Sequence, residues 1–350
     1  MTATNGKHDD ARPVMRWTRE GFTGDSTYIE RPHYPPEFTS VEGPHAPHRL
    51  RVGEVAPADR DDPAALPTPL LAARTGFRLS VSGRAAPTPF LVSNVEADEI
   101  HFVQDGVLEF ATDQGTLRGG PGDFVCIPRA IAYRVTPLQT PTRSLVLELP
   151  GAVSLGDPAL WAGDVERAAA DAPSGADGGD TVVLVKAFDG VTRYVRPHNP
   201  LARVALHDGT IPVWKLNVRS LLVNPNGPPS PFAVSRDNAE LLYNLSANPR
   251  GRPPIHVNAD YDEIIYYFAG PGAWGAVREP GTLTWVPKGI IHHGPQENVP
   301  EGYVAWLLDS RGTLRLTPAG QAAAELMETG QYGRHPSAAG APLPVASVLG

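Results

Sequence analysis

Short apolar runs separated by turn residues dominate two stretches of the chain. In the first, from about residue 74 to residue 150, runs such as GFRLSVSG, DFVCIP and SLVLEL stand between Gly, Pro and Asp residues. In the second, from about residue 181 to residue 310, the runs include TVVLVKAF, EIIYYFAG and TLTWVP. Runs of this length, rich in β-branched and aromatic residues, are typical of strands at hairpin spacing. The pattern therefore predicts an all-β protein, with helical periodicity only over residues 319–329.

The run DAPSGADGGD at residues 171–180 consists of small and turn-forming residues and separates the two strand series. It predicts a linker between an N-terminal domain at 21–170 and a C-terminal domain at 181–335. Residues 1–20 begin with a polar stretch and predict a disordered tail. The Ala- and Pro-rich residues 336–350 predict a second disordered tail.

The two strand series share a spacing pattern that indicates an internal repeat. In both, a Glu is followed after six residues by a Gly, and a later Pro-Gly pair is followed after five residues by a Pro. The matching residues are Glu99, Gly106, Pro121, Gly122 and Pro128 in the first half, and Glu263, Gly270, Pro280, Gly281 and Pro287 in the second. Two features repeated at the same spacing predict duplication of one β unit.

Composition narrows the class of protein. The 350 residues include 38 Pro and 35 Gly, which favours many turns and short strands over long helices. The formal net charge of −8, without a run of Lys or Arg, argues against binding to nucleic acid or to an anionic membrane. Cys126 is the only cysteine, which excludes an intrachain disulfide, and the polar N-terminus lacks the apolar core of a secretory signal. We therefore expect a cytoplasmic protein.

The spacing in the second half resembles the cupin barrel. The cupin pattern joins a His-x-His, Glu and Gly motif to a later Gly, Pro-x-Gly and His motif. The matching residues here are His256, Asn258, Glu263, Gly270, Gly281, Pro287, Gly289 and His292, with Asn258 at the second His position. The resemblance implies a bicupin with two jelly-roll β-barrel domains and few short helices. It also implies a metal site with His256 and Glu263 as ligands.

The third metal ligand is either His292 or His293. The preceding Pro-x-Gly anchor at 287–289 selects His292, whereas the HGP sequence selects His293. Adjacent residues of a strand point to opposite faces, so only one of the two points into the barrel. Two imidazoles and one carboxylate leave open coordination positions, which suits ferrous iron. A structural zinc site would close with Cys or a fourth ligand.

The first half keeps the scaffold of the repeat without its ligands. Val92 stands where His256 stands, Tyr133 stands where His292 stands, and only Glu99 is retained. We therefore expect this half to be metal-free and to serve packing and the shape of the cleft. His101 lies close to Glu99 in sequence, which leaves an alternative site open.

Residues 200–312 are similar to homogentisate 1,2-dioxygenase, a bicupin iron enzyme of aromatic catabolism. The similarity lies in VALHDGTIPVWKLN at 204–217, RPP at 252–254 ahead of HVN, and HHGP at 292–295. It implies Fe(II) as cofactor and dioxygen-dependent cleavage of the ring of a hydroxylated aromatic acid. It also implies an oligomer of identical subunits, and a catalytic role for His207, whose imidazole would contact the substrate hydroxyl and move its proton.

Four further residues are candidates for contact with the substrate. Arg252 is placed to pair with a substrate carboxylate or to brace its loop. Strand alternation puts Tyr261 and Tyr267 on the face that carries Glu263, and puts Tyr266 on the other face. Asn258, Tyr261 and Tyr267 would then line the pocket or support the metal ligands through hydrogen bonds.

Two other functions remain open from the sequence. A cupin can use a divalent metal as a Lewis acid for isomerisation or hydrolysis without dioxygen. A bicupin can also be a non-catalytic ligand-binding protein, and the intact ligand set argues against that function here. The partners expected are therefore a small aromatic substrate and dioxygen, with neither nucleic acid nor membrane.

Overall fold

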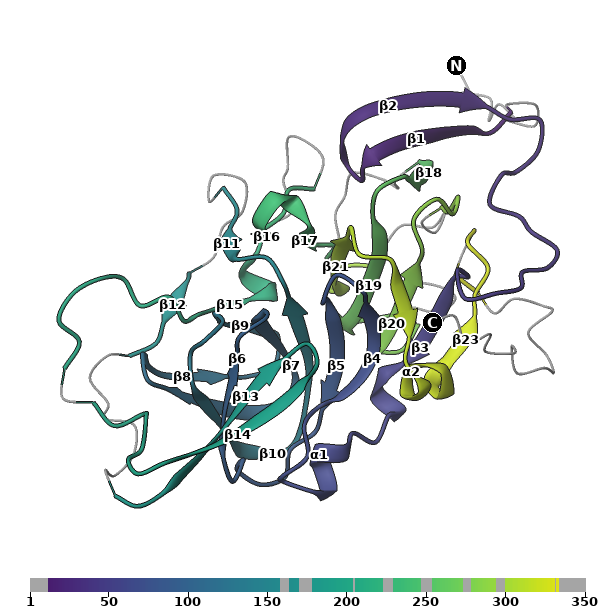
Figure 1. Ribbon diagram of the computed structural model, residues 1–350. Coiled ribbons are helices and arrows are strands. Elements are labelled where there is room, and N and C mark those ends of the chain that lie inside the picture. The colour runs from purple at the N-terminus through teal and green to yellow at the C-terminus, as the bar shows by residue number, and fades with distance from the viewer. Residues whose placement is uncertain are drawn as a thin grey trace.

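The computed structural model shows a protein built almost entirely of strands (Figure 1). It describes residues 12–157, 164–169, 178–203, 205–222, 229–246, 254–272, 278–293, 300–330 and 332–333. Within these residues the strands form a twelve-stranded, an eight-stranded and a three-stranded sheet. The prediction of an all-β protein with few short helices is confirmed for these residues.

The twelve-stranded sheet follows a path of paired strands from β12 through β15, β9, β7, β10, β5 and β4 to β22, with β6, β8, β13 and β14 beside it. Its strands are β4 Thr68–Ala73, β5 Arg78–Ser82, β6 Leu91–Asn94, β7 Asp98–Thr112, β8 Gly115–Gly119, β9 Asp123–Ile127, β10 Tyr133–Leu149, β12 Glu166–Arg167, β13 Thr181–Ala187, β14 Gly190–Arg196, β15 Trp214–Asn217 and β22 Leu314–Leu316.

The eight-stranded sheet has the order β11-β16-β17-β21-β19-β20-β3-β23. Its strands are β3 His48–Arg51, β11 Val153–Leu155, β16 Ala233–Ser235, β17 Glu240–Asn244, β19 Asp262–Ala269, β20 Thr282–Val286, β21 Val304–Ser310 and β23 Ala324–Leu326. The third sheet consists of β1 Val14–Glu20, β2 Thr23–Glu30 and β18 Ile255–Asn258.

The described helices are short. They are α1 Ala58–Asp61 and α2 Pro318–Ala323, together with the 3-10 turns η1 Val52–Glu54, η2 Val218–Ser220 and η3 Arg236–Asn238. None of the helices in the described ranges has the length and apolar character needed to cross a membrane.

Strand pairing crosses the division that the sequence places at residues 171–180. β13 and β15 follow that segment, yet they pair with β6 and β9 of the twelve-stranded sheet. β3 comes from the N-terminal half and pairs with β20 of the eight-stranded sheet. β22 near the C-terminus pairs with β4. Each sheet is therefore built from both halves of the sequence. A strand can pair with any available sheet edge that also buries its apolar side chains, whatever the distance along the chain.

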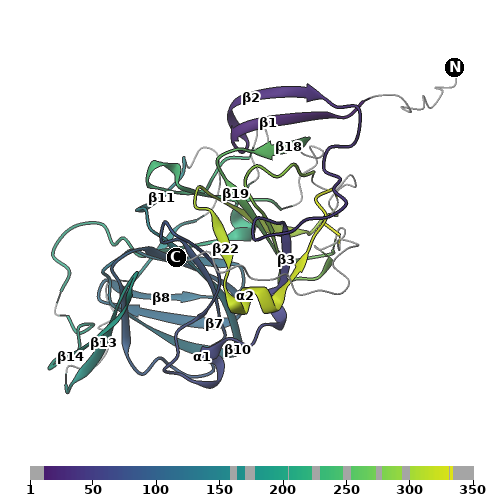
Figure 2. The same ribbon diagram turned by 45° about the vertical axis from the view of Figure 1, so that its right-hand side comes forward.

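Residues 14–20 correct the prediction of a disordered tail over residues 1–20. They form β1, which runs parallel to β18 and antiparallel to β2. The hairpin of β1 and β2 lies over β18 at one end of the molecule in both views (Figures 1 and 2). Met15 is buried there against Ile255 and Val257, which explains why this segment is ordered.

The helix expected over residues 319–329 ends earlier than predicted. α2 begins after Thr317, whose side-chain oxygen accepts a hydrogen bond from the Gly320 amide at 3.1 Å, and it ends at Ala323. The next three residues form β23, which pairs with β3. Pairing at the open edge of a sheet has overridden the helical propensity of this Ala-rich segment.

An aromatic cluster fills the space between the two large sheets. Phe102 and Phe124 of the twelve-stranded sheet contact each other with ring centroids 4.7 Å apart, and Phe102 lies 5.4 Å from Trp306 of β21. Tyr266 of β19 packs against Trp306 at 5.3 Å, and its hydroxyl donates to the Gln104 side chain of β7. Aromatic contacts of this kind add to the burial of apolar area, so the two sheets share one core. The prediction that Tyr266 faces away from Glu263 is confirmed.

Candidate metal centre

Three side chains from neighbouring strands converge in the second half of the chain. They are His256 of β18, Glu263 of β19, and His292, which follows β20. The backbones of His256 and His292 exchange two hydrogen bonds of 2.9 Å, which holds the imidazoles side by side with ring centroids 4.1 Å apart. Glu263 and His292 are buried and His256 is partly exposed.

The spacing of the donor atoms fits a metal ion. Oε2 of Glu263 lies 3.4 Å from Nε2 of His292 and 3.9 Å from Nε2 of His256, and all three donor atoms lie within 4.8 Å of one another. Ligand atoms at bond lengths of about 2.0–2.2 Å stand roughly 3.0–3.5 Å apart around one ion. Small side-chain movements would bring all three onto the same metal.

The tautomer of each imidazole is set by a backbone carbonyl. Nδ1 of His256 lies 2.8 Å from the Pro254 oxygen, and Nδ1 of His292 lies 3.0 Å from the Ile290 oxygen. Because a carbonyl only accepts, Nδ1 carries the hydrogen and Nε2 points its lone pair towards Glu263. Nε2 of His292 is buried and has no hydrogen-bond partner among the described residues. Metal-binding histidines show this arrangement.

The charges of the three groups are strongly coupled. Burial raises the pKa of Glu263, but the nearby imidazole of His292 and hydrogen bonding outweigh that effect and hold the pKa well below its usual value. Burial lowers the pKa of His292, but the Glu263 carboxylate raises it above its usual value. Burial and the charge of His292 both lower the pKa of His256. Glu263 is therefore an anion that attracts one positive charge into the site.

The two histidines proposed as third ligand have different surroundings. His292 belongs to the convergent group, whereas Nδ1 of His293 lies 3.1 Å from the Tyr34 hydroxyl and its amide donates to the Thr329 carbonyl. The reciprocal backbone bonds to His256 fix which of the two side chains points inward. The geometry favours His292 as the ligand.

Asn258 supports the carboxylate, as one of its two predicted roles requires. Its side-chain amide donates to Oε2 of Glu263 at 3.2 Å, and its own Oδ1 is buried without a partner among the described residues. A ligand carboxylate that accepts a hydrogen bond from a neighbouring side chain is held in one orientation.

Both predicted tyrosines are buried near the site strands, and each hydroxyl bonds to protein. The Tyr261 hydroxyl donates to the Asn238 carbonyl at 2.7 Å. Tyr267 stacks on Tyr303 with ring centroids 4.9 Å apart, and its hydroxyl donates to the Gly270 carbonyl. Contact of these side chains with a substrate stays a prediction.

Of the other two predicted residues, only His207 is described, and it does not belong to the convergent group. His207 is exposed in the loop that leads into β15 of the twelve-stranded sheet. Arg252 lies outside the described residues. Their proposed roles rest on the resemblance alone.

Asp309 of β21 is a site residue that the sequence did not reveal. It is paired with Glu263 across β19 and β21, so both side chains point to the same face. Its two carboxyl oxygens are buried and have no hydrogen-bond partner among the described residues. Burial and the charge of Glu263 raise its pKa well above the usual value, which favours the protonated form. The available signal was an acid within the apolar run YVAWLLDS.

The strand pairings confirm the internal repeat around the site. The residues that the spacing made equivalent occupy equivalent backbone pairs in the two halves. These pairs are His256–His292 with Val92–Tyr133, and Glu263–Val286 with Glu99–Ile127. The N-terminal copy thus has Val92 and Tyr133 where the C-terminal copy has His256 and His292.

Comparison with known proteins returns structural neighbours of low sequence identity. No family model matches the sequence. A Pseudomonas aeruginosa protein described as glyoxylate-induced shares 14% identity over 83% of this chain and 100% of its own, with a TM-score of 0.43. A variant of Bacillus subtilis oxalate decarboxylase shares 9% identity over 79% of both chains, with a TM-score of 0.36. A cupin-2 domain protein from Shewanella frigidimarina matches 23% of this chain and 79% of its own at 14% identity, with a TM-score of 0.21. Similarity at this level carries no information about activity.

Proposed function

We propose that this protein is a non-haem Fe(II) dioxygenase that cleaves the ring of a hydroxylated aromatic acid, in the manner of homogentisate 1,2-dioxygenase. One observation supports the proposal most: the Nε2 atoms of His256 and His292 converge with the Glu263 carboxylate. The Nδ1 atoms of the two histidines are held by the Pro254 and Ile290 carbonyls. Two His and one carboxylate on one side of an ion are the ligand set of non-haem Fe(II) oxygenases. The motifs shared with homogentisate dioxygenase between residues 200 and 312 favour aromatic ring cleavage over other iron chemistry.

The residues of this chain would share the work as follows. His256, Glu263 and His292 would hold the ion, and Asn258 would keep the Glu263 carboxylate in place. Ferrous iron supplies, when bound, open coordination positions for small ligands. Asp309, whose pKa is raised, would hold a proton beside Glu263. His207 and Arg252 would handle the substrate hydroxyl and carboxylate, as the resemblance implies.

The test is anaerobic purification, metal analysis and measurement of oxygen uptake. The Fe(II)-loaded protein should consume oxygen with homogentisate, gentisate or a related hydroxylated aromatic acid. Glu263→Gln removes the anionic ligand at constant size and should lower iron occupancy and abolish uptake. His33→Ala removes an exposed histidine and serves as the matched control.

Two results would contradict the proposal in different ways. Zinc or nickel as the native metal, with no oxygen uptake on any hydroxylated aromatic acid, would favour a Lewis-acid cupin. Full iron occupancy in Glu263→Gln would place the metal elsewhere in the chain.

A further inference from the structure

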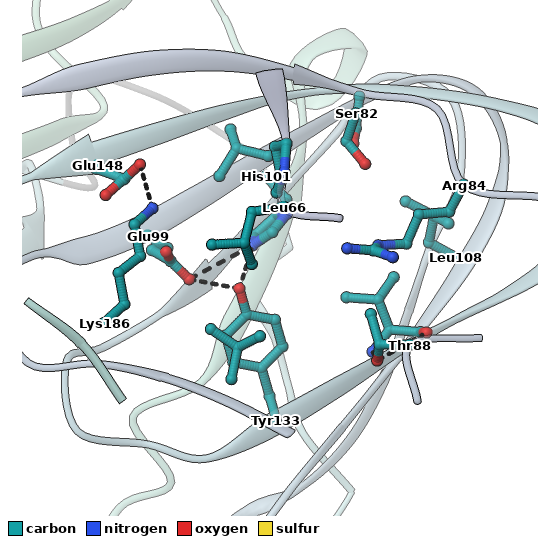
Figure 3. Close-up of a pocket in the computed structure, with 15 residues that line it drawn as sticks. Leu66, Ser82, Arg84, Thr88, Glu99, His101, Leu108, Tyr133, Glu148 and Lys186 are labelled. Atoms are coloured by element: carbon teal, nitrogen blue, oxygen red, sulfur yellow. Dashed lines mark hydrogen bonds and ion pairs between the residues drawn. The ribbon is translucent and has the colours of Figure 1, made fainter. Parts of the chain in front are cut away.

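A small cavity is lined largely by strands of the twelve-stranded sheet, in the half of the repeat that lacks the metal ligands (Figure 3). Its free volume is about 30 Å³, which is room for about two water molecules or, with small side-chain shifts, for a carboxylate group with one further carbon. Six titratable side chains line it: Arg84, Glu99, His101, Tyr133, Glu148 and Lys186. Buried charged groups are stable only when they are paired or hydrogen-bonded, so each of these side chains needs a partner.

On one side of the cavity the charges are compensated within the protein. The Tyr133 hydroxyl donates to Glu99 at 2.5 Å, and the Asn94 amide donates to both Glu99 and Glu148 at 3.0 and 3.2 Å. Lys186 donates to Glu148 at 2.7 Å. Asn94 joins these contacts into one network, and Figure 3 shows the contacts of Lys186 with Glu148 and of Tyr133 with Glu99. Both carboxylates there have protein donors, so this side has no demand for a further cation.

Arg84 lies on the opposite side of the cavity and is less well compensated (Figure 3). Its side chain is only 4% exposed, and its terminal nitrogens donate to the Pro63 and Ala65 carbonyls at 3.0 Å each. Its Nε lies 3.5 Å from Asp59, which is longer than a direct charge-assisted bond. Asp59 also accepts from the Ser82 hydroxyl at 2.6 Å.

The donors of Arg84 exceed its partners. A guanidinium group has five N–H donors, and the contacts to Pro63, Ala65 and Asp59 account for three of them. Two N–H groups, one on each terminal nitrogen, are left without a partner among the described residues. Burial lowers the pKa of Arg84, with Asp59 opposing that shift, which fits a cation whose compensation is incomplete.

We propose that this cavity is a second ligand site, which binds a short-chain carboxylate between Arg84 and the pair formed by His101 and Tyr133. The planar fork of a guanidinium matches the two oxygens of a carboxylate. The apolar side chains of Leu66 and Leu108 also line the cavity and fit a short carbon chain. A polar end of the ligand would meet the Tyr133 hydroxyl, which lies 3.4 Å from Nε2 of His101.

This site differs from the metal centre in what it can hold. Val92 and Tyr133 replace the two imidazoles at the equivalent pair, and the Tyr133 hydroxyl is bonded to Glu99. The free volume of about 30 Å³ is too small for the aromatic ring proposed as substrate of the metal centre. The cavity and the metal centre would therefore bind ligands of different size.

Ligand-detected NMR on the full-length protein tests the proposal. The protein is treated with a chelator, so that no metal can take up the acid, and is titrated with formate, acetate and glycolate. We expect saturable binding of at least one of them and none of acetamide, which has the size of acetate without its charge. Arg84→Lys keeps the charge and loses the fork, and should weaken binding about tenfold or more. Glu263→Gln in the other sheet should bind as the unchanged protein does.

A second variant guards against a folding defect at Arg84. Leu66 is partly buried at the cavity wall, so Leu66→Phe should fill the cavity and abolish binding while the near-ultraviolet circular dichroism stays native. The proposal is overturned if none of the three acids binds, which would leave water as the only occupant. It is also overturned if acetamide binds as well as acetate, or if Glu263→Gln abolishes binding and Arg84→Lys does not.

Discussion

Metal affinity at the centre of His256, Glu263 and His292 should fall about tenfold for each pH unit below the pKa of His292, because one bound proton competes with the metal. Nε2 of His292 lies 3.4 Å from the Glu263 carboxylate, which raises its pKa against the effect of burial. Burial and the charge of His292 lower the pKa of His256, so this imidazole loses its proton at lower pH than His292 does. Glu263 stays ionised throughout. The expected slope is therefore one proton per metal, equivalent to about 1.4 kcal/mol per pH unit.

The assay is a competition between the protein and a chromophoric chelator for Co(II), which resists oxidation, between about pH 5.5 and 8.5. Glu263→Gln should move the proton-dependent range to lower pH, because it removes the anion that raises the pKa of His292. His33→Ala should leave the range unchanged. A slope of two protons, or none, would refute the reasoning. The same pair makes the free energy of unfolding of the metal-free protein depend on pH. Below the usual pKa of histidine, the interaction of His292 with Glu263 stabilises the fold. This contribution is lost as the pH rises through the raised pKa of His292.

Three substitutions, two of them with a matched control, test the packing that holds the site, each by urea unfolding. Asp262 accepts hydrogen bonds from the Trp285 side chain and from two backbone amides, so Asp262→Ala should destabilise the protein by about 3 kcal/mol or more. Its control is Asp260→Ala, which removes a partly exposed ion pair with Arg19 and should cost less than about 1 kcal/mol. Gly270 has φ of +98° and a Cβ there would lie 1.9 Å from a backbone oxygen, so Gly270→Ala should cost about 2 kcal/mol or more. Its match Gly289→Ala, with φ of +80° and open space, should cost about 1 kcal/mol. Trp306→Ala in the shared core should cost about 3–5 kcal/mol. Equal decreases in the free energy of unfolding for Asp262→Ala and Asp260→Ala, or for Gly270→Ala and Gly289→Ala, would contradict the contacts described. So would a small decrease for Trp306→Ala.

Local pattern was sufficient for the strands and for the repeat, because both depend on residues close together in sequence. It failed where a segment is ordered by a distant partner: β1 owes its order to β18, and β23 forms because β3 offers an edge. His292 and His293 carry the same side chain, and only the backbone bridge to His256 distinguishes them. Asp309 joins the site through the register of β19 and β21. Pairing register is a property of two strands, so neither strand alone encodes it.

The two halves of the repeat differ chiefly in how one buried glutamate is compensated. Glu99 accepts from Tyr133 and Asn94, which are permanent donors, so the N-terminal copy satisfies its carboxylate with protein groups alone. Glu263 accepts from Asn258 and otherwise faces two imidazole Nε2 atoms, which donate only when they carry a proton. A buried anion without permanent donors requires a cation, and either a proton on His292 or a metal ion can supply it. Replacing two imidazoles by Val92 and Tyr133 thus removes the requirement for a cation at Glu99 while the strand pairing at that point is retained. The chemistry of each half follows from this exchange of donors, since the backbone pairs that hold these residues are equivalent.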